Sequence, residues 1–395
     1  MITKQPVLNI GLVGHIDHGK TTVLHRLSGV WADKHSEELK RGITIKLGYA
    51  DVTIYKDKEY NIEKKGKPVK YISFIDAPGH EMLMATMLGG AAVIDAAILV
   101  IAANETFPQP QTKEHLLALE AKGITEIIIV QNKIDLTTKE QAKEQHKKIK
   151  EYIKETIAKN AVIIPVCAQQ NININKIFEQ IDKIPIPKRD EKSDPIFLIA
   201  RSFDINKPGK KIKDLNGGIL GGVLKQGTLK VGDEIEIKPG ISMEKHGEKQ
   251  YKTVKTKIVK IMSGDNDLKE ALPSGSLAIQ TALDPFITKS DSLSGCVAST
   301  IGKLPEISSN IQLKTNLFKE IVGLKDKVKI DPIKMNEPLM LSANTTTTIG
   351  FVKKIKPDEI SLSLKIPVVP FKKERVGIAR NYQGHWRLIG WGEIF

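Results

Sequence analysis

The stretch Gly14-His15-Ile16-Asp17-His18-Gly19-Lys20-Thr21-Thr22 decides the first part of the fold. It follows an apolar run at residues 7–13 and precedes a helical pattern at residues 21–28, so we expect a strand, a glycine-bearing loop and a helix. In that context the pattern G-x-x-x-x-G-K-[ST] forms a phosphate cradle, because backbone N–H groups and the helix N-terminus face one concavity. Lys20 would reach the β- and γ-phosphates of a nucleotide, and the Thr21 hydroxyl would ligate Mg²⁺. The motif alone does not choose between ATP and GTP.

The remainder of residues 1–190 alternates apolar runs with helical patterns, which is typical of βαβ units. We therefore expect an α/β domain with a mostly parallel sheet and helices on both faces. A lysine-rich helix is predicted at 139–158, and Ile149, Ile153 and Ile157 at helical spacing indicate that its charges form an exposed face. The strands are expected at residues 7–13, 50–55, 71–75, 97–102, 127–131 and 162–166, and the other helices at 81–90, 111–122 and 173–184.

A proline-bracketed, charged linker at 185–195 separates this domain from a region of short strands and turns. Residues 227–240 alternate around a Gly-Asp turn, which predicts a hairpin in an antiparallel barrel. A second break falls at residues 302–305. The sequence thus predicts an α/β domain at residues 1–190, followed by antiparallel β-barrels at 191–303 and 304–395.

Composition limits the class of protein. The chain has 395 residues and a formal net charge of +14, which suits a partner that carries phosphates but does not identify one. Its two cysteines, Cys167 and Cys296, lie far apart and provide neither a disulfide framework nor a zinc-binding spacing. No apolar run approaches the roughly 18 residues of a membrane span, and the N-terminus has no signal-peptide pattern, so we expect a cytoplasmic protein.

Asp76-Ala77-Pro78-Gly79-His80 follows the predicted strand at 71–75. A carboxylate at that strand end can hold Mg²⁺ through water, and the Gly79 N–H can meet an oxygen of the γ-phosphate. Between this motif and the phosphate cradle, residues 35–46 form a charged segment that contains Thr44. The Thr44 hydroxyl could join the Mg²⁺ ligands while a γ-phosphate is present and leave afterwards, which is an order–disorder switch.

Asn132-Lys133-Ile134-Asp135 follows the predicted strand at 127–131 and indicates guanine. Guanine presents N1–H and N2–H donors side by side, and a carboxylate such as Asp135 accepts both. Adenine has an acceptor at N1, so it would leave that carboxylate unpaired, and sites built in this way can reject the wrong base by about 10⁴ or more. The Lys133 stem would lie along the nucleotide, and the Asn132 amide would bond the base or brace the loop.

Cys167-Ala168-Gln169 follows the strand predicted at 162–166. GTPases usually carry Ser-Ala at this place, where a backbone N–H meets guanine O6. The backbone role of Ala168 survives the exchange of serine for cysteine, whereas a side-chain role of Cys167 stays open.

With these motifs in order, the chain resembles translational GTPases, which share Arg41-Gly42-Ile43-Thr44-Ile45 and the motif that begins at Asp76. Within them it is most similar to the gamma subunit of archaeal and eukaryotic translation initiation factor two. That resemblance rests on residues 36–50, Ala102-Ala103-Asn104-Glu105, residues 201–209 and 217–222, and the closing Trp386-Arg387-Leu388-Ile389-Gly390. It extends from about residue 7 to the C-terminus.

The resemblance implies a P-loop GTPase that hydrolyses GTP to GDP and phosphate, and that carries methionylated initiator tRNA to the small ribosomal subunit. It also implies a heterotrimer, with a beta subunit on the first domain and an alpha subunit on the second. The resemblance gives His80 the place of the residue that orients the attacking water. It makes Asp17 and the Gly42 backbone ligands to a second Mg²⁺, and it places Tyr49 near the tRNA. The expected nucleotide-binding residues are His15, Ile16, Asp17, His18, Gly19, Lys20, Thr21, Thr22, Gly79, Asn132, Lys133, Asp135, Cys167, Ala168 and Gln169.

One departure from the family concerns zinc. Many archaeal members carry a four-cysteine zinc knuckle between the Tyr49 region and the Asp76 motif, and here residues 55–71 are lysine-rich and contain no cysteine. We therefore expect no zinc. Two alternatives share the architecture: an elongation-type carrier (Tu-like or selenocysteine-specific), and the GTPase subunit of sulfate adenylyltransferase. The initiation-type sequences in the switch and barrel regions favour the initiation factor.

Overall fold

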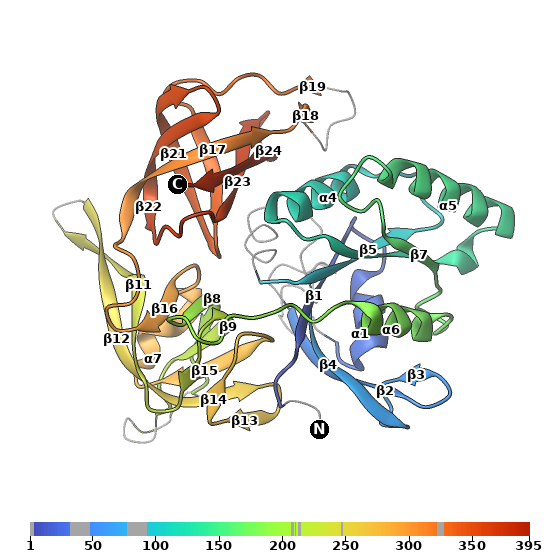
Figure 1. Ribbon diagram of the computed structural model, residues 1–395, viewed down its shortest axis with the longest axis horizontal. Coiled ribbons are helices and arrows are strands. Elements are labelled where there is room, and N and C mark those ends of the chain that lie inside the picture. Colours follow the sequence, from blue (N-terminus) through green and yellow to red (C-terminus); the bar gives the residue numbers. More distant parts are fainter. Residues whose placement is uncertain are drawn as a thin grey trace. The chain divides into compact units, whose positions relative to one another are not determined.

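A computed structural model of the chain describes residues 4–31, 48–76, 93–206, 209, 211, 215–245, 248–321 and 328–395 (Figure 1). Four of the expected site residues, Gly42, Thr44, Gly79 and His80, lie outside the described residues, and so does the helix expected at 81–90. Among the helices that are described, none is both long and apolar enough to cross a membrane.

The first domain is a seven-stranded, mostly parallel sheet in the order β3-β2-β4-β1-β5-β6-β7. β1, β4, β5, β6 and β7 run parallel, whereas β2 pairs antiparallel with both β4 and β3. Every residue of β1 and β5 is buried, which is expected of central strands covered on both faces. The strands are β1 (Leu8–Gly14), β2 (Gly48–Lys56), β3 (Tyr60–Asn61), β4 (Lys67–Asp76), β5 (Ala96–Ala102), β6 (Glu126–Asn132) and β7 (Val162–Pro165).

Helices cover both faces of this sheet, as the alternation in the sequence predicts. Figure 1 shows α4 and α5 on one side and α1 and α6 on the other. The core on the α1 and α6 side includes the buried Leu24, Phe74 and Ile177. The helices are α1 (Lys20–Ser28), α4 (Pro110–Lys122), the short η2 (Ile134–Leu136), α5 (Lys139–Ile153) and α6 (Ile174–Lys183).

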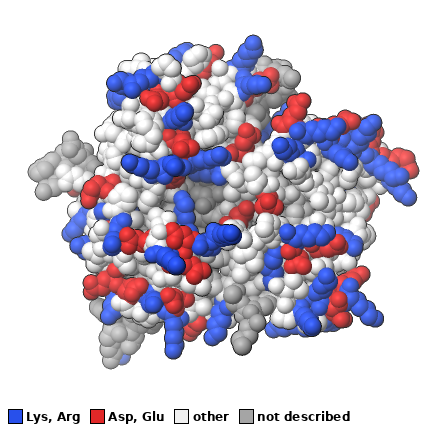
Figure 2. Space-filling view, viewed as in Figure 1, with Lys and Arg blue, Asp and Glu red and all other residues white. Residues whose placement is uncertain are grey.

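The lysine-rich helix α5 is shorter than its sequence pattern predicts. It begins with a capping box formed by Thr138 and Gln141, and it ends at Ile153 instead of residue 158. Beyond that point the Thr156 hydroxyl donates to the Ile153 carbonyl at 2.9 Å, so a side chain competes with the helical pattern of backbone bonds. Its lysines are exposed, as expected, and in Figure 2 basic side chains spread over the face in view with acidic ones among them.

The second domain is a closed antiparallel barrel in the order β11-β16-β8-β9-β15-β12, which the β11–β12 pairing closes. The Gly-Asp turn at 232–233 forms, but the hairpin expected there is wrong: β10 pairs with β14, while β11 pairs with β12 and β16. The elements are β8 (Ile196–Phe203), β9 (Ile219–Gln226), β10 (Leu229–Lys230), β11 (Glu234–Lys245), β12 (Glu248–Ser263), β13 (Asn266–Leu268), β14 (Glu270–Ala271), β15 (Leu277–Thr281), α7 (Pro285–Thr288), η4 (Lys289–Asp291) and β16 (Val297–Thr300).

The third domain is a second closed antiparallel barrel, in the order β17-β22-β21-β20-β23-β24. Leu313, Leu341, Val352 and Leu362 are among its buried side chains. The two barrels confirm the predicted fold class, while the domain boundaries at 190 and 303 stay predictions. The strands are β17 (Ser308–Leu317), β18 (Glu320–Ile321), β19 (Val328–Lys329), β20 (Pro338–Ala343), β21 (Thr346–Lys356), β22 (Glu359–Val368), β23 (Arg375–Tyr382) and β24 (His385–Ile394).

Candidate nucleotide-binding site

Predicted site residues among those that the structure describes lie at the carboxyl ends of the parallel strands of the first domain. Gly14 ends β1, Asp76 ends β4, Asn132 ends β6, and Cys167 follows shortly after β7. In open parallel sheets, ligands bind in the crevice at this edge. The sheet therefore brings together motifs that start as far apart in the chain as Gly14 and Cys167.

The loop between β1 and α1 has a backbone that only glycine accommodates well at its two ends. Gly14 has φ 140°, and a Cβ there would lie 2.3 Å from the Val100 carbonyl oxygen. Gly19 has φ 87°, and a Cβ there would lie 2.5 Å from the Asn132 amide nitrogen. Asp17 also lies in the left-handed region, at φ 57°. These conformations give the turn its concave shape.

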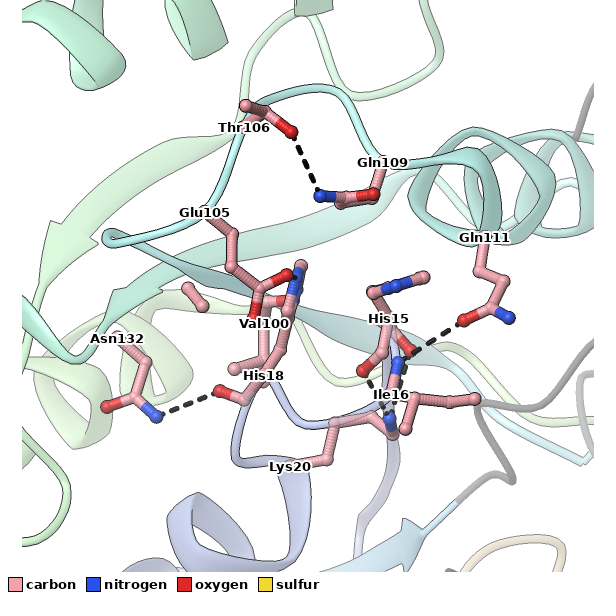
Figure 3. A network of polar contacts seen from close by, with 12 residues as sticks. His15, Ile16, His18, Lys20, Val100, Glu105, Thr106, Gln109, Gln111 and Asn132 are labelled. Atoms are coloured by element: carbon pink, nitrogen blue, oxygen red, sulfur yellow. Dashed lines mark hydrogen bonds and ion pairs between the residues drawn. The ribbon is translucent and has the colours of Figure 1, made fainter. Parts of the chain in front are cut away.

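Lys20 is folded back over this loop (Figure 3). Its Nζ donates to the carbonyl oxygens of Gly14 at 3.0 Å and His15 at 2.8 Å, and the residue is buried. A buried ammonium needs such partners. Its position at the loop mouth is the one from which it can reach phosphate oxygens.

Two histidines of the motif lie side by side, with the ring centroids of His15 and His18 5.1 Å apart. His18 is buried, and its two ring nitrogens lie 3.0 Å from the Val100 carbonyl oxygen and 3.2 Å from a Glu105 carboxylate oxygen. Burial lowers the pKa of His18 below its ordinary value, against the opposite effect of those two partners. His18 thereby anchors the loop to β5 and to the segment that follows it.

Helix α4 supplies two loop contacts that the sequence analysis missed. The Gly14 N–H donates to His115 Nδ1 at 2.7 Å, and the Ile16 N–H donates to Gln111 Oε1 at 3.3 Å. Burial lowers the pKa of His115 to about 3, so the ring is neutral and carries its proton on Nε2. Nothing in the motif points to these residues, because they lie about 100 positions along the chain. In this structure the two N–H groups therefore face α4.

The candidate magnesium ligands Thr21 and Asp76 are brought together. The Thr21 hydroxyl donates to Asp76 Oδ2 at 3.3 Å, and Asp76 is fully buried. A hydroxyl and a carboxylate beside a phosphate site are oxygen donors of the kind Mg²⁺ prefers. Among the described residues no three His, Cys, Asp or Glu side chains cluster in a way that could hold a metal ion.

The base end of the site is built around Asn132. Its amide donates from Nδ2 to the His18 carbonyl at 3.0 Å, and its Oδ1 accepts the Ala168 N–H at 3.1 Å. In this structure the Ala168 N–H, which the sequence assigns to guanine O6, therefore donates to the Asn132 side chain. Lys133 adopts a left-handed φ of 62° and turns the chain toward Asp135.

Cys167 stands where GTPases usually carry serine. The side chain is buried and forms no disulfide. Burial raises the pKa of its thiol, and so does the neighbouring Asp135 carboxylate.

Two further features bear on the sequence predictions. Tyr49 lies in β2 opposite Ile75, next to the pair Gly48 and Asp76, so it is close to the phosphate end of the strands. Residues 55–71, where the zinc knuckle would lie, form a β2–β3–β4 hairpin region tied to α6 by the Tyr60 hydroxyl, which donates to Asp182 at 2.9 Å.

Two protein families match parts of this chain. Residues 5–186 match the family described as the Elongation factor Tu GTP binding domain, and residues 309–394 match the family Initiation factor eIF2 gamma, C terminal. The chain is 50% identical to Translation initiation factor 2 subunit gamma of Methanococcus maripaludis (strain S2), over 99% of each chain. It is 51% identical to the protein of the same name from Thermoplasma volcanium, over 99% of this chain and 97% of that one.

Solved structures share the fold at low sequence identity. A bacterial selenocysteine-specific elongation factor, EF-Sec, superposes with a TM-score of 0.77 at 21% identity and covers 99% of this chain, which spans 58% of that factor. Translation elongation factor SelB from Methanococcus maripaludis, in complex with a GTP analogue, gives 0.73 at 22% identity, over 100% of this chain and 79% of that one. These likenesses support the three-domain architecture. The sequence matches, which run the whole length, place the chain in the gamma-subunit family of archaeal translation initiation factor 2, the translational GTPases with a GTP-binding domain of the elongation factor Tu type.

Proposed function

We propose that this chain binds methionylated initiator tRNA in its GTP form and delivers it to the small ribosomal subunit, with hydrolysis of GTP to GDP and phosphate as the release switch. It would act as the central subunit of a heterotrimer with alpha and beta subunits. The proposal is supported by the convergence of Thr21, Asp76 and Asn132 at one sheet edge, in a chain whose relatives are named initiation factor 2 gamma subunits.

Phosphate binding would begin with Lys20. Its Nζ now bonds two loop carbonyls, and it would exchange part of these contacts for the β- and γ-phosphate oxygens. Mg²⁺, when bound, would neutralise charge on the phosphates, held by Thr21 directly and by Asp76 through water. The long bond from the Ile16 N–H to Gln111, at 3.3 Å, is the loop contact most easily given up for a phosphate oxygen.

Base selection would rest on Asp135, Asn132 and the loop at 167–169. Asp135 would accept N1–H and N2–H of guanine. Asn132 connects residues 167–169, the base loop, to residues 14–22, the phosphate loop, through its two hydrogen bonds. Lys133 would line the nucleotide with its aliphatic stem. ATP would leave the Asp135 carboxylate without its two donors.

The switch and the hydrolysis step are carried over from the family resemblance. Thr44 would join the magnesium ligands only with GTP bound, Asp17 and the Gly42 backbone would help hold a second Mg²⁺, and His80 would orient the attacking water. His80→Ala is then expected to slow single-turnover GTP hydrolysis about a hundredfold while leaving GTP affinity nearly unchanged. An unchanged rate would remove His80 from this role.

A direct test compares the binding of initiator and elongator methionyl-tRNA to the chain with GTP or GDP, with and without alpha and beta subunits. We expect the initiator tRNA to bind best with GTP in the complete heterotrimer, and its affinity to fall with added salt because phosphate contacts contribute. Equal binding of both tRNAs would refute the initiation function and favour an elongation-type carrier. Because the family resemblance gives Tyr49 a place near the tRNA, Tyr49→Ala should weaken tRNA binding more than GTP binding.

A further inference from the structure

Arg26 makes two contacts that belong to none of the sequence motifs. It lies in the second turn of α1, and its guanidinium reaches the loop that follows β7. Its Nε donates to the Ala168 carbonyl at 2.8 Å, and its Nη2 donates to the Gln169 carbonyl at 2.7 Å. One side chain thus holds two consecutive carbonyls of the base loop, 142 and 143 residues away in sequence.

The base loop is closed on itself and attached to the phosphate loop on its other side. Cys167 and Ile172 exchange backbone hydrogen bonds, with the Cys167 N–H at 3.3 Å from the Ile172 carbonyl and the Ile172 N–H at 3.0 Å from the Cys167 carbonyl. The Ala168 N–H donates to Asn132, which in turn donates to His18. Arg26 therefore attaches the base loop to α1, and Asn132 attaches the same loop to the segment between β1 and α1.

The planarity of the peptide bond carries this attachment to the base-binding groups. A carbonyl that points toward Arg26 directs the N–H of the same peptide unit to the opposite side. The two carbonyls that Arg26 holds belong to the peptide units of the Gln169 and Gln170 N–H groups, directly after the Ala168 N–H that the sequence assigns to guanine O6. The orientation of these peptide units therefore sets how the loop that would meet guanine O6 lies.

We propose that Arg26 is a positioning residue for guanine recognition: by holding the Ala168 and Gln169 carbonyls it sets the orientation of the base loop. This role rests on the proposed function of the site. A guanidinium suits it because its planar donors can serve two carbonyls at once, which an ammonium at the same place does less well. The Gln169 carbonyl is exposed and the Ala168 carbonyl also accepts the Asn171 N–H at 3.3 Å, so loss of Arg26 should misplace the loop without unfolding it.

The test compares two ligands on wild type and Arg26→Ala: GDP, and the diphosphate of 2-aminopurine riboside, which lacks guanine O6 and N1–H. We expect Arg26→Ala to weaken GDP binding about tenfold, equivalent to about 1.4 kcal/mol, mainly through faster dissociation. Binding of the analogue should change less than about twofold, because it lacks the O6 that the base loop would meet. Arg26→Lys should recover part of the loss.

His25→Ala is the matched control. His25 is the neighbouring residue of α1, stacked on Trp31 with ring centroids 4.1 Å apart, and it should leave the affinities for both ligands unchanged. Unchanged GDP affinity in Arg26→Ala would overturn the proposal, and so would an equal loss for both ligands, since that would indicate a general defect of the domain. A wild-type chain that binds ADP as well as GDP would instead refute the guanine site itself, and the role of Arg26 with it.

Discussion

The two ends of the nucleotide site are built in different ways. The phosphate end is one contiguous segment, residues 14–22. Its shape comes from the positive φ angles of Gly14 (140°), Asp17 (57°) and Gly19 (87°). The base end has no such segment. It is assembled from Asn132 at the end of β6, the loop that starts at Cys167, and the side chain of Arg26 on α1.

The two ends of the site are sensitive to different kinds of substitution. A contiguous loop with a glycine-dependent backbone fails when a Cβ is added, because there is no space for the atom. An end assembled from distant segments fails when a side chain that bridges them is removed. The phosphate end nevertheless has bridges of its own, since Gln111 and His115 of α4 accept N–H groups of the loop.

The largest effect should come from the base end. Asp135→Asn is expected to weaken GTP about a thousandfold or more, because an amide cannot accept both guanine donors and presents its own N–H groups to them. Affinity for XTP, which carries an oxygen in place of the N2 amine, should rise in the same variant. The measurement is the ratio of the two dissociation constants, and a ratio equal to that of wild type would contradict the role of Asp135.

Gly19→Ala probes the phosphate end. Its Cβ would lie 2.5 Å from the Asn132 amide nitrogen at a φ of 87°, so we expect nucleotide affinity to fall about a hundredfold through displacement of both groups. Gly302→Ala is the matched control, because that glycine has φ 79° with nothing within 4 Å of a Cβ. Titration with a fluorescent GDP compares the two variants. Equal affinities would mean that the close approach to Asn132 is unimportant.

His115 should make stability depend on pH. Its pKa is lowered to about 3 in the folded chain, so its neutral form is favoured there and the unfolded chain binds more protons below its ordinary pKa. Stability from this group is therefore lost as pH falls from about 6.5 toward 3. Between pH 7 and pH 5 the loss amounts to about 2 kcal/mol. His115→Asn should reduce the drop in unfolding free energy over that range by about this amount, measured with denaturant; an unchanged drop would contradict the burial of a neutral ring.

The smallest effect concerns the bridge from α4 to the phosphate end. His115→Leu removes the acceptor of the Gly14 N–H and leaves a buried donor, so nucleotide affinity should fall about tenfold. His115→Asn places an amide oxygen near the former Nδ1 and should bind nucleotide more tightly than His115→Leu. If both variants bind nucleotide as wild type does, the contact from α4 does not shape the loop.

Much of the fold could be predicted from the chain alone. The strand before Gly14, the order of the three nucleotide motifs and the change from an α/β domain to β-barrels all follow from local patterns of apolar residues, glycine and proline. The errors occurred where tertiary pairing overrides a local pattern. β10 pairs with β14 and not with its neighbour β11. α5 ends at Ile153, whose carbonyl accepts both the N–H and the hydroxyl of Thr156.

The sequence by itself determined the chemistry of the site: the phosphate loop, the magnesium candidates Thr21 and Asp76, and the guanine candidate Asp135. These residues are recognisable because short spacings impose a local backbone shape, and because each follows a strand. Only the tertiary structure decided which other residues support them. His115, Gln111 and Arg26 look like ordinary helix residues, and each acts on a backbone group about 95–143 residues away, where a contact depends on how helices pack on the sheet rather than on spacing along the chain.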